Sequence, residues 1–518
     1  GDTGDFSNVI YTGYPVSVPG QGATVTPFLE SDPVLGDVDE HFAGNYLDED
    51  TILKAARDEG LETASIGKLG PALIFDSTQR DGQHTVVLDD QTGSKDGVPL
   101  ADWVKQGFAA INLAPVAPGR GQPNGDFKTP GTLKANVVQQ DWFVAATTKV
   151  VLPKLKADGK GFVLVYWSRD PDGTQHNQGD SLGRVTPGIN GPTSMAAIRN
   201  ADDNLASLRK ALDDLGLAAT TDIIVTSDHG FSTITKASAT SPAAKQSYKD
   251  TRPGELPPGF LALDLAKALD LPLHDPDAGE RQIGPGEHTS RANGLIGQDP
   301  RKPDIVVAAN GGSDLVYLPA KDPALARRVV EILLRQDYVS GLFVDTALGP
   351  IPGTLPLKTI NLEGSAVTPM PAIAVNFTSG STGCADATLC GTEIADTVLQ
   401  TGQGMHGSFS RADTRNFMAA IGPSFKTAFV DDAPASNADL GKTIAALFAL
   451  KTSDKGSLVG RVLSEAFPGG SIPASERKTQ RSAPGIDGLQ TILDYQLVGT
   501  TAYFDAAGFP GRTVGLVP

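Results

Sequence analysis

Cysteine is the scarcest residue of this chain, with only two among 518 residues. Cys384 and Cys390 stand six positions apart in a Gly-rich loop, and they could close a small disulfide loop. Such a pair with no other thiol favours an exported protein, periplasmic or secreted, whereas two free thiols are the alternative. A Cys-x-x-Cys spacing for zinc is absent.

Long apolar runs and an excess of positive charge are also missing. No apolar run reaches about 18 residues, so no membrane-spanning helix is predicted. Lys and Arg number 43 against 60 Asp and Glu, and the net charge of −17 is spread along the chain. This balance favours a soluble protein and argues against nucleic acid or an anionic membrane as partner. A small anionic substrate stays compatible, because bound dications reverse the local potential.

The length of the chain and its first residue bear on its domain organisation and processing. A chain of 518 residues equals several average domains, or one large α/β core with insertions. Gly1 is not an initiator residue and no signal peptide precedes it. We therefore expect a processed chain, a truncated chain or a fragment.

The stretch TDIIVTSDHGFST, residues 221–233, is the most informative one. Residues 222–226 predict a short buried strand of a parallel sheet. Asp228 and His229 follow at its carboxyl end, where α/β sheets bind ligands. A carboxylate beside an imidazole offers two metal donors. The alternative is a strand-end turn with a solvated Asp and a capping His.

A second cluster of the same kind follows the predicted strand 161–168. In the sequence RDPDGTQHNQGD, Asp172 and His176 are four positions apart, which would place them on one face of a helix. Pro171 and Gly173 favour a loop instead.

The order of elements predicts an α/β fold. A helix over 194–215 leads into strand 222–226, and a strand, helix, strand order implies a parallel, doubly wound sheet. Residues 1–47 are expected to be mostly loop. Further helices are predicted over 48–59, 139–156, 323–336 and 436–450. The expected organisation is a first part of the core (1–235), an insertion or cap (236–355), a second part of the core (356–470) and an extension ending in a hairpin (471–518).

Together, three segments supply five metal donors. They are carboxylates and imidazoles without a thiolate, which suits a two-metal site with two Zn²⁺ ions, Mn²⁺ or Ca²⁺ being alternatives. The donors are Asp172, His176, Asp228, His229 and His406. The remaining histidines lack such contexts and are expected to be structural or on the surface: His41, His84, His274 and His288.

The ordered motifs DPDGTQH, TSDHGF and GMHGS resemble the alkaline phosphatase superfamily, most closely its type I phosphodiesterase/nucleotide pyrophosphatase branch. The resemblance covers roughly residues 1–468. It implies an alkaline-phosphatase-like fold, a doubly wound and mostly parallel sheet with helices on both faces and an inserted cap. It also implies hydrolysis of small phosphorylated substrates through two zinc ions and a covalent phosphoryl-enzyme.

The resemblance further implies a role for each residue of these motifs. Asp172, His176 and His406 would bind one zinc, and Asp228 and His229 the other. Lys68, at the end of the predicted strand ETASIG, resembles a lysine that contacts the substrate oxyanion; a surface lysine is the alternative. Asn8 in GDFSN resembles an asparagine that binds a phosphoryl oxygen.

The same resemblance places the nucleophile and a further metal-binding Asp before Gly1. No Cys-x-Pro-x-Arg motif exists, so the sulfatase mechanism is not supported. Phosphate monoesters, diesters and pyrophosphates all remain compatible, and residues 236–355 are expected to set the choice.

Two other functions compete with this one. Residues 179–183, GDSLG, match the Gly-x-Ser-x-Gly motif of serine esterases, with Ser181 as nucleophile. That motif requires a strand directly before the serine and a helix directly after it, and neither is predicted here. The second alternative is a homologue that binds metal and a ligand without catalysis.

Overall fold

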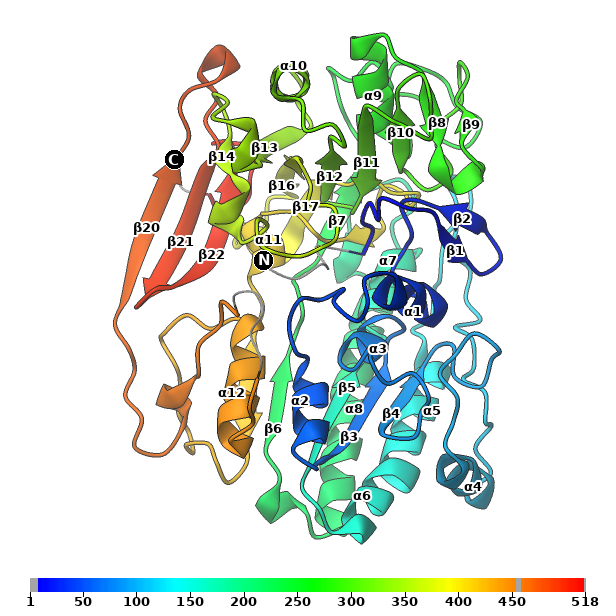
Figure 1. Cartoon of the computed structure of the whole chain (residues 1–518), viewed down its shortest axis with the longest axis vertical. Helices are drawn as coiled ribbons and strands as arrows, with labels where there is room; N and C mark the ends of the chain where they lie inside the picture. Colours follow the sequence, from blue (N-terminus) through cyan, green and yellow to red (C-terminus); the bar gives the residue numbers. More distant parts are fainter. Residues whose placement is uncertain (1–7, 453–457, 517–518) are drawn as a thin grey trace.

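The computed structural model describes residues 8–452 and 458–516 and shows a mixed α/β protein (Figure 1). The predicted α/β class is confirmed. Parallel strands with their helices make up the lower part of the view, a large mostly antiparallel sheet the upper part, and a three-stranded sheet one side. Within the described residues, no helix is both long and apolar enough to cross a membrane.

The parallel sheet has the order β4-β3-β5. Its apolar residues pack with the surrounding helices on a common core that includes Ile66, Leu88 and Phe143. The predicted helix over 139–156 is confirmed as two helices joined by a π-helical turn. The elements are β3 (Glu62–Gly67), β4 (Thr85–Asp89), β5 (Phe162–Trp167), α5 (Val137–Ala146), α6 (Leu152–Asp158) and α8 (Pro192–Asp214).

Strand β6 (Ile223–Thr226) confirms the strand predicted over 222–226, but its environment differs from the prediction. It pairs antiparallel with β19 (Met418–Ile421), its partner among the described strands. A two-stranded ribbon covers its residues less than a full sheet does, so all four are half-buried and not buried. The prediction of a buried parallel strand was therefore wrong for this element.

The largest sheet has eight strands and uses residues 273–377. All its pairings are antiparallel except that of β13 with β14. Helices α9 (Phe260–Leu269) and α10 (Pro323–Leu333) bury apolar residues against it. In sheet order the strands are β14 (Leu355–Pro356), β13 (Val339–Val344), β15 (Ile373–Phe377), β12 (Ser313–Tyr317), β11 (Ile305–Ala309), β10 (Gly294–Ile296), β8 (Leu273–Asp275) and β9 (Arg281–Gln282). The domain boundaries at residues 235, 355 and 470 stay predictions.

A four-stranded sheet, in the order β16-β17-β7-β18, joins the segment after β6 to the GMHGS motif. Strand β18 pairs with β7, Gly404 opposite Thr233. The predicted disulfide is confirmed, since Cys384 and Cys390 are bonded in the β16–β17 connection. The strands are β7 (Ser232–Thr235), β16 (Ser379–Ser381), β17 (Gly391–Ile394) and β18 (Gly404–Met405).

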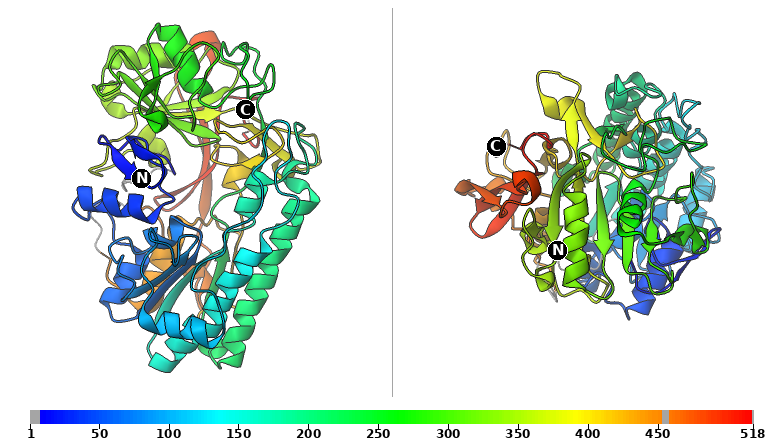
Figure 2. Two further views of the ribbon diagram at one scale, coloured as in Figure 1. Left: turned by 90° about the vertical axis from the view of Figure 1, so that its right-hand side faces the viewer. Right: turned by 90° about the horizontal axis from the view of Figure 1, so that it is seen from above.

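The two ends of the chain add one element that was predicted and one that was not. The C-terminal sheet, β20 (Ser475–Arg481), β21 (Ile492–Val498) and β22 (Thr501–Gly508), contains the expected hairpin. Helix α1 (Asp32–His41) lies in a segment predicted to be mostly loop. The side view in Figure 2 shows this blue N-terminal segment between the upper and lower parts of the molecule.

Helix α1 begins beside the end of β4 with two buried carboxylates in contact. Asp32 accepts the N–H of Val98 at 3.2 Å, and Asp89 accepts that of Gln91 at 2.9 Å. Burial raises the pKa of Asp32 to about 6, and burial with the charge of Asp32 raises the pKa of Asp89 well above its usual value. A raised folded-state pKa means that this pair stabilises the fold fully below about pH 4 and loses that contribution as pH rises through 6.

We therefore predict that the Asp32→Asn substitution becomes more stabilising, in unfolding free energy, as pH rises. Relative to the unsubstituted protein, the variant should gain about 1–2 kcal/mol of unfolding free energy between pH 5 and pH 8, because an amide does not ionise. Thermal or urea unfolding at the two pH values measures this. An equal change at both would contradict it.

Candidate metal centre

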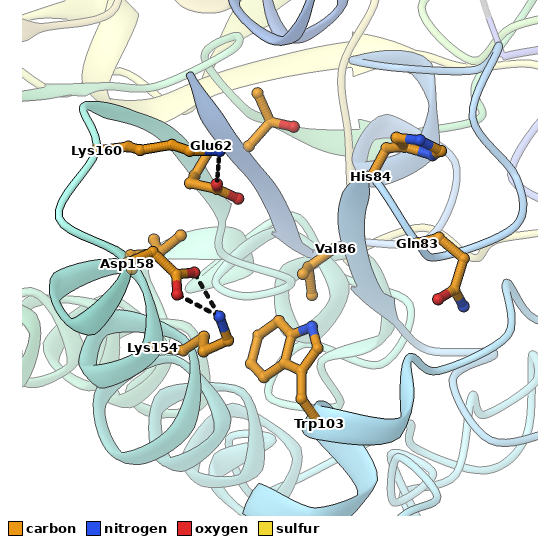
Figure 3. Close-up of a pocket in the computed structure, with 10 residues that line it drawn as sticks. Glu62, Gln83, His84, Val86, Trp103, Lys154, Asp158 and Lys160 are labelled. Carbon is orange, nitrogen blue, oxygen red and sulfur yellow. Dashed lines mark hydrogen bonds and ion pairs between the residues drawn. The ribbon is translucent and has the colours of Figure 1, made fainter. Parts of the chain in front are cut away.

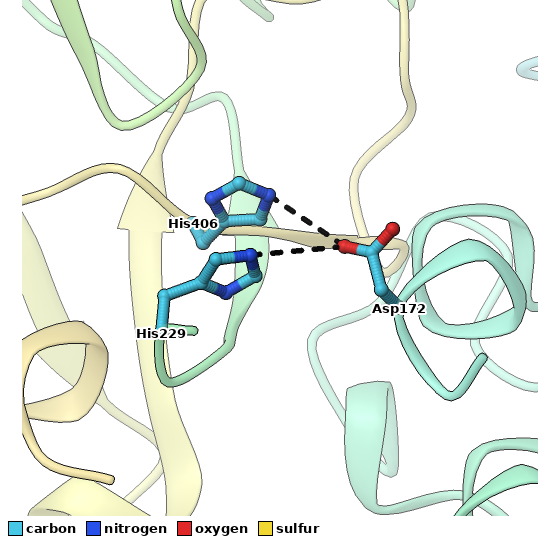
Figure 4. A group of neighbouring side chains, drawn as sticks. All are labelled: Asp172, His229 and His406. Carbon is cyan, nitrogen blue, oxygen red and sulfur yellow. Dashed lines mark ion pairs between the residues drawn. The ribbon is translucent and has the colours of Figure 1, made fainter. Parts of the chain in front are cut away.

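The fold brings the five predicted donors to the carboxyl ends of β5 and β6. Asp172 and His176 lie on α7 (Asp172–Asn177), which corrects the expectation of a loop. His229 follows β6 and His406 follows β18. Figure 4 shows Asp172, His229 and His406 converging, and their ligand atoms all lie within 4.8 Å of one another.

One carboxylate oxygen, Asp172 Oδ1, is the centre of the cluster. It lies 3.1 Å from His176 Nε2, 3.7 Å from His406 Nε2 and 4.0 Å from His229 Nε2. Asp228 extends the group, with Oδ2 3.3 Å from His229 Nε2. Asp172 thus lies within 4.0 Å of histidines that the family resemblance assigns to different metals.

The hydrogen bonds of two histidines fix which nitrogen carries the proton. His176 Nδ1 lies 2.9 Å from the carbonyl oxygen of Gly404, and His229 Nδ1 lies 2.8 Å from that of Gly230. A carbonyl only accepts, so each Nδ1 must donate, and in the neutral ring Nε2 is then a lone pair. Metal-binding histidines in proteins commonly have this arrangement, in which the ring nitrogen that does not bind the metal donates to a carbonyl or carboxylate.

The centre of the cluster contains buried acceptor atoms that no hydrogen bond from the described part of the chain satisfies. Asp172 Oδ1 and His406 Nε2 are buried and have no hydrogen-bond partner among the described residues. Leaving such groups unpaired costs about 1–3 kcal/mol each. A cation would satisfy them, and the nitrogen and oxygen donors suit zinc, so the residues present fit a metal.

Two cations hold the other oxygen of Asp172. Lys68 Nζ lies 3.2 Å and Arg169 Nη1 3.3 Å from Oδ2. Lys68 also pairs with Glu30 at 3.0 Å, and Arg169 with Asp90 at 3.3 Å. Burial alone would raise the pKa of Asp172, but the neighbouring ammonium group of Lys68 holds it well below its usual value. Asp172 is therefore an anion at neutral pH.

His406 is held as a neutral ligand. Burial, and then the proximity of His229 and His176, lowers its pKa well below the usual value for histidine. Its ring stacks on that of His229, with centroids 3.5 Å apart, and Phe231 packs at 5.4 Å. A neutral imidazole keeps its lone pair free for a metal.

Two other predicted site residues, Asn8 and Ser181, are not part of this cluster. Asn8 is exposed, and its carbonyl accepts the N–H of Leu29 at 2.8 Å; no hydrogen bond or ion pair of its side chain reaches the cluster within the described residues. Its phosphoryl-binding role stays a prediction. Ser181 is buried after α7, not after a strand, and its Oγ accepts the N–H of Gly188 at 2.6 Å. This geometry argues against a serine esterase.

A shallow depression of 370 Å³ lies at the opposite end of the parallel strands (Figure 3). Its lining includes Glu62 and His84, at the amino ends of β3 and β4, and the ring of Trp103. Lys68 and Asp172 follow the carboxyl ends of β3 and β5, so this depression is separate from the metal centre.

Asp413, which sequence reasoning missed, ties together the loops that carry His229 and His406. Its Oδ2 accepts the N–H and the hydroxyl of Ser408, each at 2.8 Å. Its Oδ1 accepts the hydroxyl of Ser232 at 2.9 Å, and its main-chain carbonyl accepts the N–H of Gly230 at 2.7 Å. This residue is therefore placed to fix the stacking of the two histidines.

We predict that Asp413→Asn weakens zinc binding about 10- to 100-fold, because residues that orient metal ligands have effects of that size. The measurement is a zinc dissociation constant from competition with a chelator, beside thermal unfolding of the metal-free chain. Asp202→Ala, an exposed carboxylate on α8, is the control. Unchanged zinc affinity in a folded Asp413→Asn protein would contradict this role.

Solved structures and a family model match this chain. Human ectonucleotide pyrophosphatase/phosphodiesterase 5 matches with 14% identity and a TM-score of 0.35, over 77% of this chain and 69% of its own. The murine protein of the same name matches with 15% identity and a TM-score of 0.39, over 77% and 70%. No match is found among curated protein sequences. The family model for type I phosphodiesterase/nucleotide pyrophosphatase matches residues 37–328, more than half of the chain. The chain therefore belongs to the type I phosphodiesterase/nucleotide pyrophosphatase family.

Proposed function

We propose that this protein hydrolyses phosphoric esters of small molecules through two zinc ions and a covalent phosphoryl-enzyme. Family membership supports a phosphoester hydrolase. The observation that carries the proposal is the buried meeting of Asp172 Oδ1 with the Nε2 atoms of three histidines. We assign Asp172, His176 and His406 to one zinc, and Asp228 and His229 to the other.

The metals and the chain's own residues contribute different things. When bound, the two dications act as Lewis acids on the phosphoryl group and on the attacking oxygen. Asp172 and Asp228 supply the negative charge that retains them, and Phe231 packs against the rings of His176 and His406. The prediction that the attacking hydroxyl and a further Asp lie before Gly1 stays a prediction.

Lys68 is placed to bind a phosphoryl oxygen. An ammonium group has three donors, and Glu30 and Asp172 take two of them. Those carboxylates raise the pKa of Lys68 despite its burial, so it remains charged. The third proton is available to an anionic oxygen of the substrate, where it would stabilise charge in the transition state.

An oxidising compartment suits the same proposal. The disulfide between Cys384 and Cys390 supports a periplasmic or secreted protein. Mn²⁺ and Ca²⁺ are alternatives to zinc that elemental analysis distinguishes.

The proposal is tested by metal content and turnover of the intact protein, which would supply the attacking hydroxyl and the further Asp predicted to lie before Gly1. We expect close to two zinc ions per chain and hydrolysis of a phosphate monoester, a diester or pyrophosphate, lost on chelation and restored by zinc. Asp228→Asn and His406→Ala should each lower zinc content and activity. At most one zinc and no turnover, or unchanged properties in both variants, would overturn the proposal.

For Lys68→Ala we expect zinc to be retained, because removing a cation strengthens the field that holds metals. The turnover number should fall by about 10²–10³, as when one donor to a transition-state oxyanion is removed. Zinc content and kcat, measured on the same preparation, check this. Lys302→Ala, an exposed lysine in the loop between β10 and β11, is the control. Loss of zinc from Lys68→Ala would assign this lysine to holding Asp172 instead.

A further inference from the structure

Arg120 stands beside the metal centre without a partner. It lies in the Gly/Pro-rich loop 115–131, and its guanidinium meets that of Arg169 over Gly173, the residue after Asp172. A Cβ added at Gly173 would lie 2.6 Å from Arg169 Nη1 and 3.1 Å from Arg120 Nη1. Two like charges therefore share the space above the start of α7.

The neighbouring cations are paired, and Arg120 is not. Arg169 has Asp90 and Asp172, and Lys68 has Glu30 and Asp172. Within the described residues, Arg120 donates no hydrogen bond and no carboxylate oxygen lies within 4.0 Å of its nitrogens. Its Nε and Nη2 are buried without an acceptor, while Nη1 is not fully buried.

The carboxylate that acts most strongly on Arg120 is already occupied. Asp170, whose charge acts on Arg120, accepts the N–H of Thr174 at 2.6 Å and the amide of Asn136 at 3.0 Å. Burial lowers the pKa of Arg120, yet a guanidinium keeps its charge in proteins. A half-buried charge with no acceptor is unfavourable unless a ligand supplies one.

The position of Arg120 is held by the loop around it. Gln403 donates to the carbonyl of Asn124 at 2.8 Å, and Arg252 donates to that of Phe127 at 2.7 Å. Thr132 forms a bridge with Gln178, directly after α7. These contacts tie both the loop and α7 to the rest of the site.

We propose that Arg120 forms an anion subsite for a second anionic group of the substrate, beyond the phosphoryl group held at the histidines. The Oδ1 atom of Asp172 faces the histidines, and its Oδ2 atom faces Lys68 and Arg169. Arg120 lies beside Arg169. Because Arg120 meets Arg169 over Gly173, and Arg169 binds Oδ2, the anion bound by Arg120 would be a group other than the phosphoryl group at the histidines. A planar guanidinium suits both a phosphate and a carboxylate.

This inference rests on the proposed phosphoesterase function and adds that the substrate carries a second anionic group. The test is calorimetric binding to the zinc-loaded chain of three probes: orthophosphate, pyrophosphate and phosphonoacetate. In Arg120→Gln we expect pyrophosphate, phosphonoacetate or both to bind about tenfold or more weakly, and orthophosphate to change less than about twofold. Which probe loses affinity shows whether the second group is a phosphate or a carboxylate. Arg120→Lys, which keeps the charge without the fork, should lose part of the affinity.

Arg209→Gln, an exposed arginine near the far end of α8, is the matched control and should bind all three probes normally. Zinc content should be unchanged in every variant. If orthophosphate binds but Arg120→Gln affects no probe, or all three equally, the subsite is wrong while the proposed function stands. If no probe binds the zinc-loaded unsubstituted chain, the proposed function fails and the subsite with it. Should Arg120→Gln not fold, Arg120→Lys gives the same comparison.

Discussion

The carboxylate of Asp172 is the group on which the rest of this site depends. Its two oxygens face opposite environments, the cations Lys68 and Arg169 at Oδ2 and the histidine nitrogens at Oδ1. The cations keep it ionised in a buried place where a lone carboxylate would take up a proton. When the surrounding histidines are neutral, an ionised oxygen that faces their lone pairs is unfavourable without a metal and favourable with one. The energetics of the apo site therefore select for a cation.

The long-range pairing of the sheets is what brings the histidines to this carboxylate. His229 and His406 are far apart in sequence, but β7 pairs with β18 directly after one and before the other. The carbonyls of Gly404 and Gly230 then fix the rings of His176 and His229, and Asp413 connects the two loops. The backbone thus sets the tautomers as well as the positions, which side-chain packing alone would not do.

The sequence alone was enough to predict the α/β class, several of the helices and the disulfide, because periodicity and short motifs are local signals; it also named five side chains that the fold brings together, whose role as metal donors stays a prediction. It missed that Asp172 begins a helix: Pro171 and Gly173 suggest a loop, whereas Asp170 accepts the N–H of Thr174 and α7 packs on α8. It also placed β6 in a buried parallel sheet, which only the pairing with β19 corrects. Glu30, Arg169 and Asp413 carry no local signature, since their roles arise from partners far away along the chain.

Net charge was a poor guide to the charge at the site. The chain carries −17, yet Lys68, Arg169 and Arg120 gather within one small region around Asp172. Glu30 and Asp90 compensate two of these cations on the side away from the histidines. Asp172 and Asp170 are carboxylates of the same region, so the protein groups alone leave no excess of positive charge, and an anion would be attracted only where bound dications reverse the local potential. The proposed charge of the substrate thus depends on the metals and on the few residues around Asp172, and the composition of the chain does not report it.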